Sequence, residues 1–457
     1  MSTYRTPDVY IEEISVFPPS VAEVETAIPA FIGYTETARR LADDDLRGRP
    51  TPVYSFAEYE QFFGQPQAET IAVALTTAGA GFGSAVTPPP ATHLLHYAVK
   101  SFFDNGGGKC YVVSVAGYAS PAVVDVGELS AGLAAVALED EPTLLVIPEA
   151  VRLGANDYAT LAQAMLLQCG TLKDRFAILD LFDGGAAQDD SALGAHRAAF
   201  GNNHLKYGAA YYPFLRSGIN HFVRSDEGNV AVSIDGGAAA ALGSLRTSNT
   251  AAYNTVKSAL REHHVVLPPS GAVAGVYAMT DTARGVWKAP ANVSLNNVIE
   301  PLVKLDNAHQ DGLNIDPITG KSVNAIRAFA GKGVLVWGAR TLAGNDNEWR
   351  YVSVRRFFNM VEESVKKSSY WAVFEPNDAN TWVKVRGMIE NYLTQKWREG
   401  ALAGATTKEA FFVRCGLGTT MTAQDILEGR MNVEIGMAVV RPAEFVVLKF
   451  SHKLQTS

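Results

Sequence analysis

The sequence predicts a mixed α/β fold that carries an extended, strand-forming segment at each end. Three observations support this prediction. Strand-like and helix-like segments alternate between residues 109 and 265, which is typical of an α/β domain. The last third of the chain contains two amphipathic helices among several short strands. Residues 9–11 and 445–450, near the two ends, are rich in the β-branched and aromatic residues that favour strands.

The first ninety residues are expected to contain an arm, a core strand and two loops. In the arm, residues 9–11 form a strand between Pro7 and the extended Pro18-Pro19 pair. A strand this short is not stable alone, so it needs the edge of a sheet to pair with. The other expected elements are a buried strand at 30–34, a charged loop at 39–50, a short surface element at 52–63 and a mobile, Gly-, Thr- and Pro-rich loop at 76–90.

The middle of the chain alternates between strands and helices. Tyr158, Leu161, Met165 and Cys169 recur at the spacing of one helix face. The other expected elements are strands at 111–113, 143–147 and 176–181 and a helix at 250–263.

The last third is predicted to hold two amphipathic helices among strands. One has an apolar stripe from Val354 to Val365, with acid-to-base pairs four residues apart, such as Glu363–Lys367, on the opposite face. The other begins at an Asn377-Asp378 cap and buries a stripe that includes Val385. The remaining expectations are a strand pair at 323–329 and 334–337 around a turn at 331–333, a strand at 411–413, a short helix at 422–428, and two long strands at 431–439 and 445–450.

These elements suggest a discontinuous core domain, with a mixed β-sheet and flanking helices, interrupted by an inserted α/β domain. The expected core comprises residues 21–90 and 265–440, and the insertion residues 91–264. Residues 1–20 and 441–457 are the two terminal arms.

Composition excludes several classes of protein. The 457 residues include 39 Lys and Arg against 47 Asp and Glu, which gives a net charge of −8, and no basic patch stands out. Nucleic-acid binding is therefore not expected. Apolar residues make up 47% and charged residues 19%, which excludes a wholly disordered chain. The three cysteines are widely spaced, and no segment has the pattern of a signal peptide or a membrane span, so neither a disulfide framework nor membrane insertion is predicted.

No motif assembles a catalytic site, so the sequence predicts neither an enzyme nor a cofactor or metal site. Residues 106–110 resemble the end of a phosphate-binding loop, but Cys110 stands where the loop needs a hydroxyl, and a glycine turn is favoured. Ser364 and Lys367 have a spacing known from serine–lysine enzymes, although Glu363 already accounts for the lysine. His263-His264 are adjacent and cannot chelate one ion together. The three aspartates at 43–45 suit a solvated loop better than a cation site.

Long motifs follow one another in a set order towards the two ends of the chain. LNIDPITGKSVNAIRAFAGKGVLVWGARTL (313–342) precedes WRYVSVRRFFNMVEESVKKSSYWAVFEPND (349–378) and ILEGRMNVEIGMAVVRPAEFVVLKFSH (426–452), which holds a Pro-Ala-Glu-Phe junction. The start has TPDVYIEEIS and then IPAFIGYT. These motifs resemble contractile tail sheath proteins, which occur in contractile-tailed phages and extracellular contractile injection systems. The resemblance is specific over about 1–35 and 265–457 and only generic over about 90–265, the variable, outward-facing region in that family.

The resemblance implies that both arms are donated strands, each pairing with the sheet of a neighbouring subunit. The implied donor residues are Val9, Tyr10, Ile11, Phe445, Val446, Val447, Leu448 and Lys449. The implied hinges are Pro18-Pro19 and the Arg441-Pro442 junction. Candidates for contact with an inner tube are Glu409, Asp425, Glu428 and Arg430, for which an ordinary solvated helix face is an equal alternative.

The implied function is that of a structural subunit. Such subunits form stacked rings or a helical sheath around an inner tube and contract to drive the tube through a target envelope, without a cofactor. The implied partners are further copies, the inner tube, baseplate and terminal cap proteins, and other sheath paralogues. Assembly is expected in the bacterial cytoplasm, in a phage tail or a phage-tail-like particle that lysis releases. Two alternatives stay open: a specialised paralogue that forms one layer near the baseplate or cap, and an enzyme on the α/β scaffold.

Overall fold

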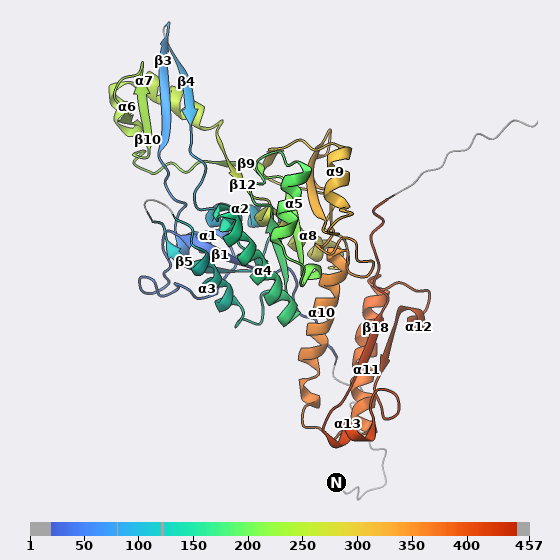
Figure 1. The fold of residues 1–457 in the computed structure, drawn as a ribbon. Helices are drawn as coiled ribbons and strands as arrows, with labels where there is room; N and C mark the ends of the chain where they lie inside the picture. The colour runs from blue at the N-terminus through green and yellow to red at the C-terminus, as the bar shows by residue number, and fades with distance from the viewer. Residues whose placement is uncertain (1–19, 80, 120–122, 446–457) are drawn as a thin grey trace, which may run out of the picture. The chain divides into compact units, whose positions relative to one another are not determined.

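The computed structural model describes residues 20–79, 81–119 and 123–445, which fall into two compact units (Figure 1). The small unit comprises Met1–Val24 and Val361–Val440, and the large unit comprises Glu25–Met360 and Arg441–Ser457. The sequence predicts an inserted domain that begins after residue 90 and ends at residue 264, and the two units do not divide at these positions. The chain passes between the units at 24/25, at 360/361 and at 440/441.

A nine-stranded sheet forms the centre of the large unit. Its strands from β5 to β15 run parallel, and β2, β16 and β13 join antiparallel at the two sides. Every residue of β1, β6, β7 and β8 is buried, as expected for parallel strands covered on both faces. The order is β13 (Val293–Ser294), β16 (Gly333–Val336), β15 (Val323–Phe329), β8 (Gly208–Tyr212), β7 (Phe176–Asp180), β6 (Leu144–Val146), β1 (Pro29–Thr35), β5 (Cys110–Gly117) and β2 (Thr51–Val53).

Helices cover both faces of this sheet, which confirms the predicted mixed α/β fold. One apolar core joins the sheet to α1 (Phe56–Phe63), α2 (Leu95–Asp104) and α8 (Ser270–Arg284). The other joins it to α3 (Val126–Val136), α4 (Ala155–Leu172), η1 (Pro148–Arg152) and η2 (Leu205–Tyr207), and α5 (Asp190–Ala199) packs on α4. The predicted face of α4 is fully buried. The element expected on the surface at 52–63 instead places Tyr59 and Phe63 in the core, because the aromatic side of α1 faces α2.

A second, four-stranded sheet contains the segment that was predicted to be a loop at 76–90. That prediction is wrong: β3 (Ile71–Ala78) and β4 (Gly81–Thr87) form a hairpin, because Ile71, Val73 and Leu75 alternate with exposed residues and face an apolar core. The other strands of this sheet are β10 (Val230–Ile234) and β11 (Ala240–Ala241). Helices α6 (Leu242–Ser248) and α7 (Thr250–Leu260) share its apolar core.

A third sheet and one further helix complete the large unit. The sheet has the order β12 (His264–Leu267), β9 (Leu215–Asn220) and β14 (Val298–Pro301), and the helix is α9 (Asn307–Asn314). The strands β5 to β8, which lie in the expected insertion, share the nine-stranded sheet with β1 and β15.

The small unit is built on two long helices and a two-stranded sheet. Helix α10 (Val352–Ser368) passes from the large unit into it, and α11 (Ala379–Arg398) begins at Asp378, whose side chain accepts from the Thr381 N–H as predicted. The strand predicted at 431–439 is shorter in the structure, because Asn432 forms hydrogen bonds with Thr420 and residues 438–440 bond to residues 401–403 and 410. The other elements are η3 (Tyr370–Ala372), α12 (Thr407–Ala410), β17 (Phe411–Arg414), α13 (Ala423–Leu427) and β18 (Glu434–Met437).

Candidate functional site

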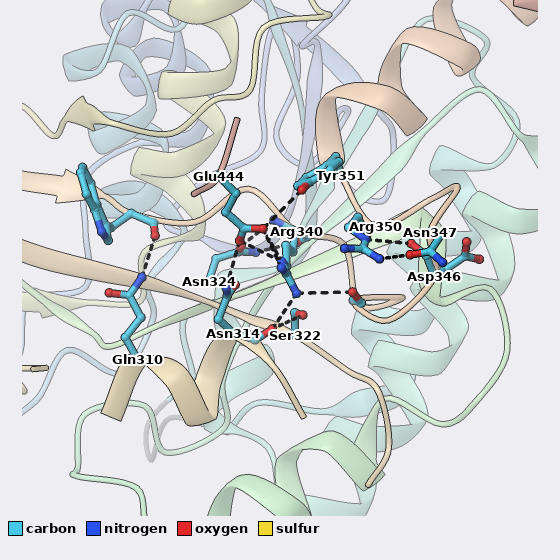
Figure 2. Close-up of polar contacts among 12 residues, drawn as sticks. Gln310, Asn314, Ser322, Asn324, Arg340, Asp346, Asn347, Arg350, Tyr351 and Glu444 are labelled. Carbon is cyan, nitrogen blue, oxygen red and sulfur yellow. Dashed lines mark hydrogen bonds and ion pairs between the residues drawn. The ribbon is translucent and has the colours of Figure 1, made fainter. Parts of the chain in front are cut away.

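The Pro-Ala-Glu-Phe junction is fixed to the large unit by the carboxylate of Glu444 (Figure 2). Arg340 binds this carboxylate through two nitrogens: Nη2 lies 2.6 Å from Oε2 and Nε 2.9 Å from Oε1. The Asn314 side chain donates to Oε1 at 2.9 Å, and the Tyr351 hydroxyl donates to Oε2 at 3.3 Å. Arg340 is 3% exposed and the Glu444 side chain 21%. We call this group of four side chains the C-terminal root.

Buried polar contacts hold Arg340 in position. The side chain of Asn324, on β15, accepts from the Arg340 N–H at 2.8 Å and donates to its carbonyl at 2.8 Å, so it pairs with that residue as a neighbouring strand would. The guanidinium also donates to the Asn314 carbonyl at the end of α9. Because a bidentate arginine–carboxylate pair fixes orientation as well as distance, the root fixes the position of Glu444 on the large unit.

The electrostatics of the C-terminal root favour an ionised Glu444. Partial burial opposes ionisation, but the hydrogen bonds from Arg340 and Asn314 and the arginine charge outweigh it and hold the pKa of Glu444 below its ordinary value. The carboxylate is therefore charged at neutral pH, and the pair is ionic.

A second anchor lies in the small unit, just after the N-terminal arm. The hydroxyls of Ser368 and Ser364 on α10 accept from the N–H groups of Ala22 and Val24, each at 3.0 Å. Between these two residues, Glu23 forms an ion pair with Lys396 of α11. Burial lowers the pKa of Lys396, but Glu23 and Glu399 outweigh this effect and raise it. We call these contacts the N-terminal root.

Ser364 and Lys367, which have the spacing of serine–lysine enzymes, both have structural partners. The Ser364 hydroxyl accepts a hydrogen bond from the backbone N–H of Val24. Lys367 lies 3.2 Å from Glu363, and this is the ion pair predicted from the sequence. In the three ranges that the structure describes, no group of three His, Cys, Asp or Glu side chains is arranged to hold a metal ion. Asp45 instead accepts from three successive backbone N–H groups of its own loop.

Strands β17 and β18 form an antiparallel pair against α11. Within the described chain they pair only with each other, apart from a single bridge between Leu402 and Val439 beyond the end of β18. Val413 is buried, whereas Phe412 on the opposite side is 41% exposed. Isolated two-stranded sheets are marginally stable, and an unpaired edge is a template for a further strand.

The charged residues predicted for tube contact lie around α12 and α13. Asp425 and Thr422 form a reciprocal capping box at the start of α13. Arg430 lies 3.2 Å from Asp425 and forms an ion pair with Glu428. The structure therefore brings three of the four candidates together. Glu409 belongs to α12, where it accepts from the Ala405 N–H.

The predicted arm residues lie mostly outside the described ranges. The predicted residues outside the described ranges are Val9, Tyr10, Ile11, Pro18, Pro19, Val446, Val447, Leu448 and Lys449. Phe445 is described and is 68% exposed, next to the fixed Glu444. Arg441 donates to the Asn347 carbonyl at 2.7 Å, so this predicted hinge residue stands where the chain re-enters the large unit.

Reasoning from the sequence missed both roots. It selected the Pro-Ala-Glu-Phe junction but not Arg340, Asn314 or Tyr351 as its partners, and it did not select Glu23 or Lys396. The available signal was an acid inside each terminal apolar segment, Glu444 by itself in one and Glu23 together with Glu25 in the other, since a carboxylate in such a place needs a cationic partner.

No helix within residues 20–79, 81–119 and 123–445 combines the length and apolarity that a membrane span requires.

Comparison with known proteins agrees with this architecture. The family model described as the phage tail sheath C-terminal domain matches residues 344–453, and that of the phage tail sheath protein central domain matches residues 215–342. The tail sheath proteins of Vibrio phage KVP40 and Enterobacteria phage T4 are 30% and 29% identical over 134 and 130 residues. Each alignment covers 28% of this chain and 19% of the relative, so the match spans about a fifth of the length of these relatives.

Solved structures match over nearly the whole chain. A chain in the cryo-EM structure of the anti-feeding prophage (AFP) baseplate is 32% identical, with a TM-score of 0.67, and the match covers 99% of this chain and 100% of that one. A chain of the AFP helical sheath in the contracted state is 31% identical with the same TM-score and coverage. A chain of the contracted PVC sheath complex, an extracellular contractile injection system, is 28% identical with a TM-score of 0.66, at 99% coverage of both chains. With two matching domain models and relatives of this identity and coverage, the chain belongs to the phage tail sheath protein family.

Proposed function

We propose that this chain is a structural sheath subunit that polymerises around an inner tube and contracts to drive the tube through a target envelope. Neighbouring subunits would be linked by strand exchange through both arms, and no catalysis or cofactor would be involved. The observation that carries the proposal is the combination of two anchored roots, one next to each arm, with a two-stranded sheet whose outer edges pair with no other strand among the described residues.

The sheet of β17 and β18 is the proposed acceptor of the arms. An extended segment that adds to such an edge gains main-chain hydrogen bonds, while alternate side chains set the register. Residues 9–11 of one neighbour and 445–449 of another would complete the sheet. Because the donor and acceptor surfaces differ, the contact is heterologous, and identical subunits can continue as rings or helices without closing off.

The roots would carry the tension between subunits during contraction. An arm that pulls on its neighbour transmits force to the last fixed point of its own chain, which is Glu23 at one end and Glu444 at the other. The proposed hinges are Pro18-Pro19 and Arg441-Pro442, and the latter directly follows the unit boundary at 440/441. Contraction would then change interfaces while the donated strands stay connected.

The surface of α13 is the proposed contact with the inner tube, together with Glu409. Asp425, Glu428 and Arg430 largely neutralise one another, which also suits an ordinary solvated surface. Reversing the charge of Asp425 and Glu428 to lysine distinguishes the two. Loss of co-assembly with the tube protein at low salt supports contact, and intact co-assembly supports the solvated surface.

Deleting residues 1–15 tests the proposed strand exchange. The expected product has the circular dichroism spectrum and thermal midpoint of the full chain but sediments as a monomer. A separate deletion of residues 446–457 should have the same effect. Sheath tubes of normal length in negative-stain micrographs of either variant would contradict strand exchange.

A specialised layer near the baseplate is the second candidate, because a chain of the AFP baseplate structure matches as well as one of the contracted helical sheath. Negative-stain microscopy of the full chain separates the candidates: long striated cylinders indicate the main sheath and short rings a single layer. In either case we propose a phage tail or an extracellular contractile particle as the location, assembled in the bacterial cytoplasm and released by lysis. Further copies, the inner tube, baseplate and cap proteins and other sheath paralogues are the proposed partners.

A further inference from the structure

The nine-stranded sheet of the large unit has a topological switch point at β1. The connection from β1 to β5 includes α2, on one face of the sheet, whereas the connection from β5 to β6 is α3, on the other face. Both β5 and β6 run parallel to β1, so the carboxyl ends of the three strands meet at one edge. In open α/β sheets, this edge at a switch point is where ligands bind, often phosphates held by helix N-termini.

The carboxylate of Glu149 occupies the helix N-terminus at this edge. Glu149 follows β6 and is fully buried. Its Oε1 accepts from the N–H groups of Leu94 and Leu95 at 3.0 and 2.7 Å. These are the N-cap and first residue of α2, which has no side-chain cap of its own. A carboxyl group from another element therefore accepts from two of the N–H donors that a bound phosphate uses in phosphate-binding folds.

The same arrangement recurs at the neighbouring strand. Asp180 is the last residue of β7 and is buried. Its Oδ1 accepts from the N–H of Ser270 at 2.8 Å, the first residue of α8, which also lacks a side-chain cap. Helices α2 and α8 pack closely on one face of the sheet, since a Cβ on Gly271 would lie 2.6 Å from the Ala98 carbonyl oxygen. In both of these adjacent helices, a backbone N–H at the N-terminus donates to a carboxyl group from the edge of the sheet.

Strand β1 closely approaches the carboxyl group of Glu149. A Cβ at Gly33 of β1 would overlap the carboxylate of Glu149, so only a glycine allows this approach, as glycines do at bound phosphates. His93, next to Leu94, is 2% exposed, and neither ring nitrogen has a hydrogen-bond partner among the described residues. Its ring lies between those of Tyr34 and Tyr118, at centroid distances of 4.7 and 5.0 Å. The edge therefore combines two backbone donors, which Glu149 occupies, with a buried ring that has no hydrogen-bond partner among the described residues.

We propose that the Glu149 carboxyl group is an internal acceptor that fills the phosphate site of this α/β sheet, with the Asp180 carboxyl in the equivalent place at α8. The intact chain is closed to phosphate-bearing ligands at this edge, and removing the Glu149 carboxylate opens a site for a small oxyanion at the N-terminus of α2. The site would take inorganic phosphate, sulfate or formate, whose oxygens reach the N–H groups of Leu94 and Leu95.

Thermal unfolding of Glu149→Ala, titrated with sodium phosphate, tests this proposal. Sodium chloride at equal ionic strength is the reference. The midpoint of the variant should rise by roughly 2 °C for each tenfold increase in phosphate above its dissociation constant, since a ligand that binds only the folded state stabilises it by mass action. The intact chain should show no difference between the two salts. Glu149→Gln keeps an acceptor and fills the space, so it should respond as the intact chain does.

Asp125→Ala is the matched control, because Asp125 caps α3 by an ordinary local bond to the Glu128 N–H at the surface. Its loss should not be recovered by phosphate. Should Glu149→Ala fail to fold, refolding yield replaces the midpoint, and formate or phosphate should raise it above the chloride level. The proposal is overturned by an equal phosphate response in the intact chain and the variant, or by a variant that recovers neither stability nor refolding yield with any of these anions.

Discussion

Removing the Glu444 carboxylate should destabilise the C-terminal root far more than the loss of a surface charge does. In Glu444→Ala, the guanidinium of Arg340 stays almost fully buried and, among the described residues, keeps only the carbonyls of Asn314 and Gly344, at 3.2 and 3.5 Å. Breaking a buried ion pair by removing one partner costs about 3–5 kcal/mol. Since water reaches part of the Glu444 side chain, the lower end applies, about 3 kcal/mol, or roughly 150-fold in the equilibrium constant.

Two assays measure this effect. Urea unfolding of the full chain gives the change in free energy of unfolding, and limited proteolysis of a C-terminally tagged chain gives the rate at which the segment after Val440 opens. Glu300→Ala is the matched control, because Glu300 lies 3.1 Å from Arg216 in the same unit but both side chains are over 40% exposed. That pair should contribute no more than about 1 kcal/mol.

A double variant separates the ionic contact from packing. Replacing Arg340 and Glu444 together with methionine removes the unpaired charge, so the loss should be smaller than for either single replacement. The reasoning is refuted if Glu444→Ala loses no more stability than Glu300→Ala and its C-terminal segment is cleaved no faster than that of the intact chain.

Three further predictions concern other positions. Burial raises the pKa of Glu149 to about 7, above its unfolded value. The free energy of unfolding of the intact chain, relative to Glu149→Gln, should therefore be highest below about pH 4.5 and fall by roughly 3 kcal/mol as the pH rises to about 7. A difference between the two variants that does not change with pH would contradict this. Gly33→Ala forces the Glu149 carboxylate away from β1 and should lower the thermal midpoint by several degrees, whereas Gly48→Ala, with open space around it but a positive φ, tests strain alone. Thr422→Ala removes the capping box of α13 and should cost about 1 kcal/mol in urea unfolding, with the exposed Thr419→Ala as a nearby comparison; no loss beyond that of the comparison would show that the cap contributes nothing.

Much of the local structure was predictable because it depends on residues close together in the chain. The helix from Ala379 follows from the Asp378 cap and an apolar stripe at helical spacing, and the hairpin of β15 and β16 follows from two apolar runs around a turn with two glycines at positive φ. The hairpin of β3 and β4 was missed because glycine, threonine and proline favour turns, and those propensities outweighed the alternation of Ile71, Val73 and Leu75.

The candidate site was predictable only in part. The motifs pointed to the Pro-Ala-Glu-Phe junction and to the terminal segments, since these are continuous in sequence. The partners were not, because Arg340 lies 104 residues before Glu444, and Ser364 lies 340 residues after Val24. No periodicity or spacing relates residues that far apart.

The sequence by itself determined the family, the mixed α/β class and the positions of the elements with the clearest periodicity or caps, because hydrophobic periodicity, capping residues and turn glycines act over a few residues. Only the tertiary structure decided which charges are paired. Arg340 meets Glu444 and Glu149 meets the start of α2 because the sheet order brings distant segments to one place. A buried charge depends on its partner in space for its stability, and that partner is set by the packing of whole elements and not by the order of residues.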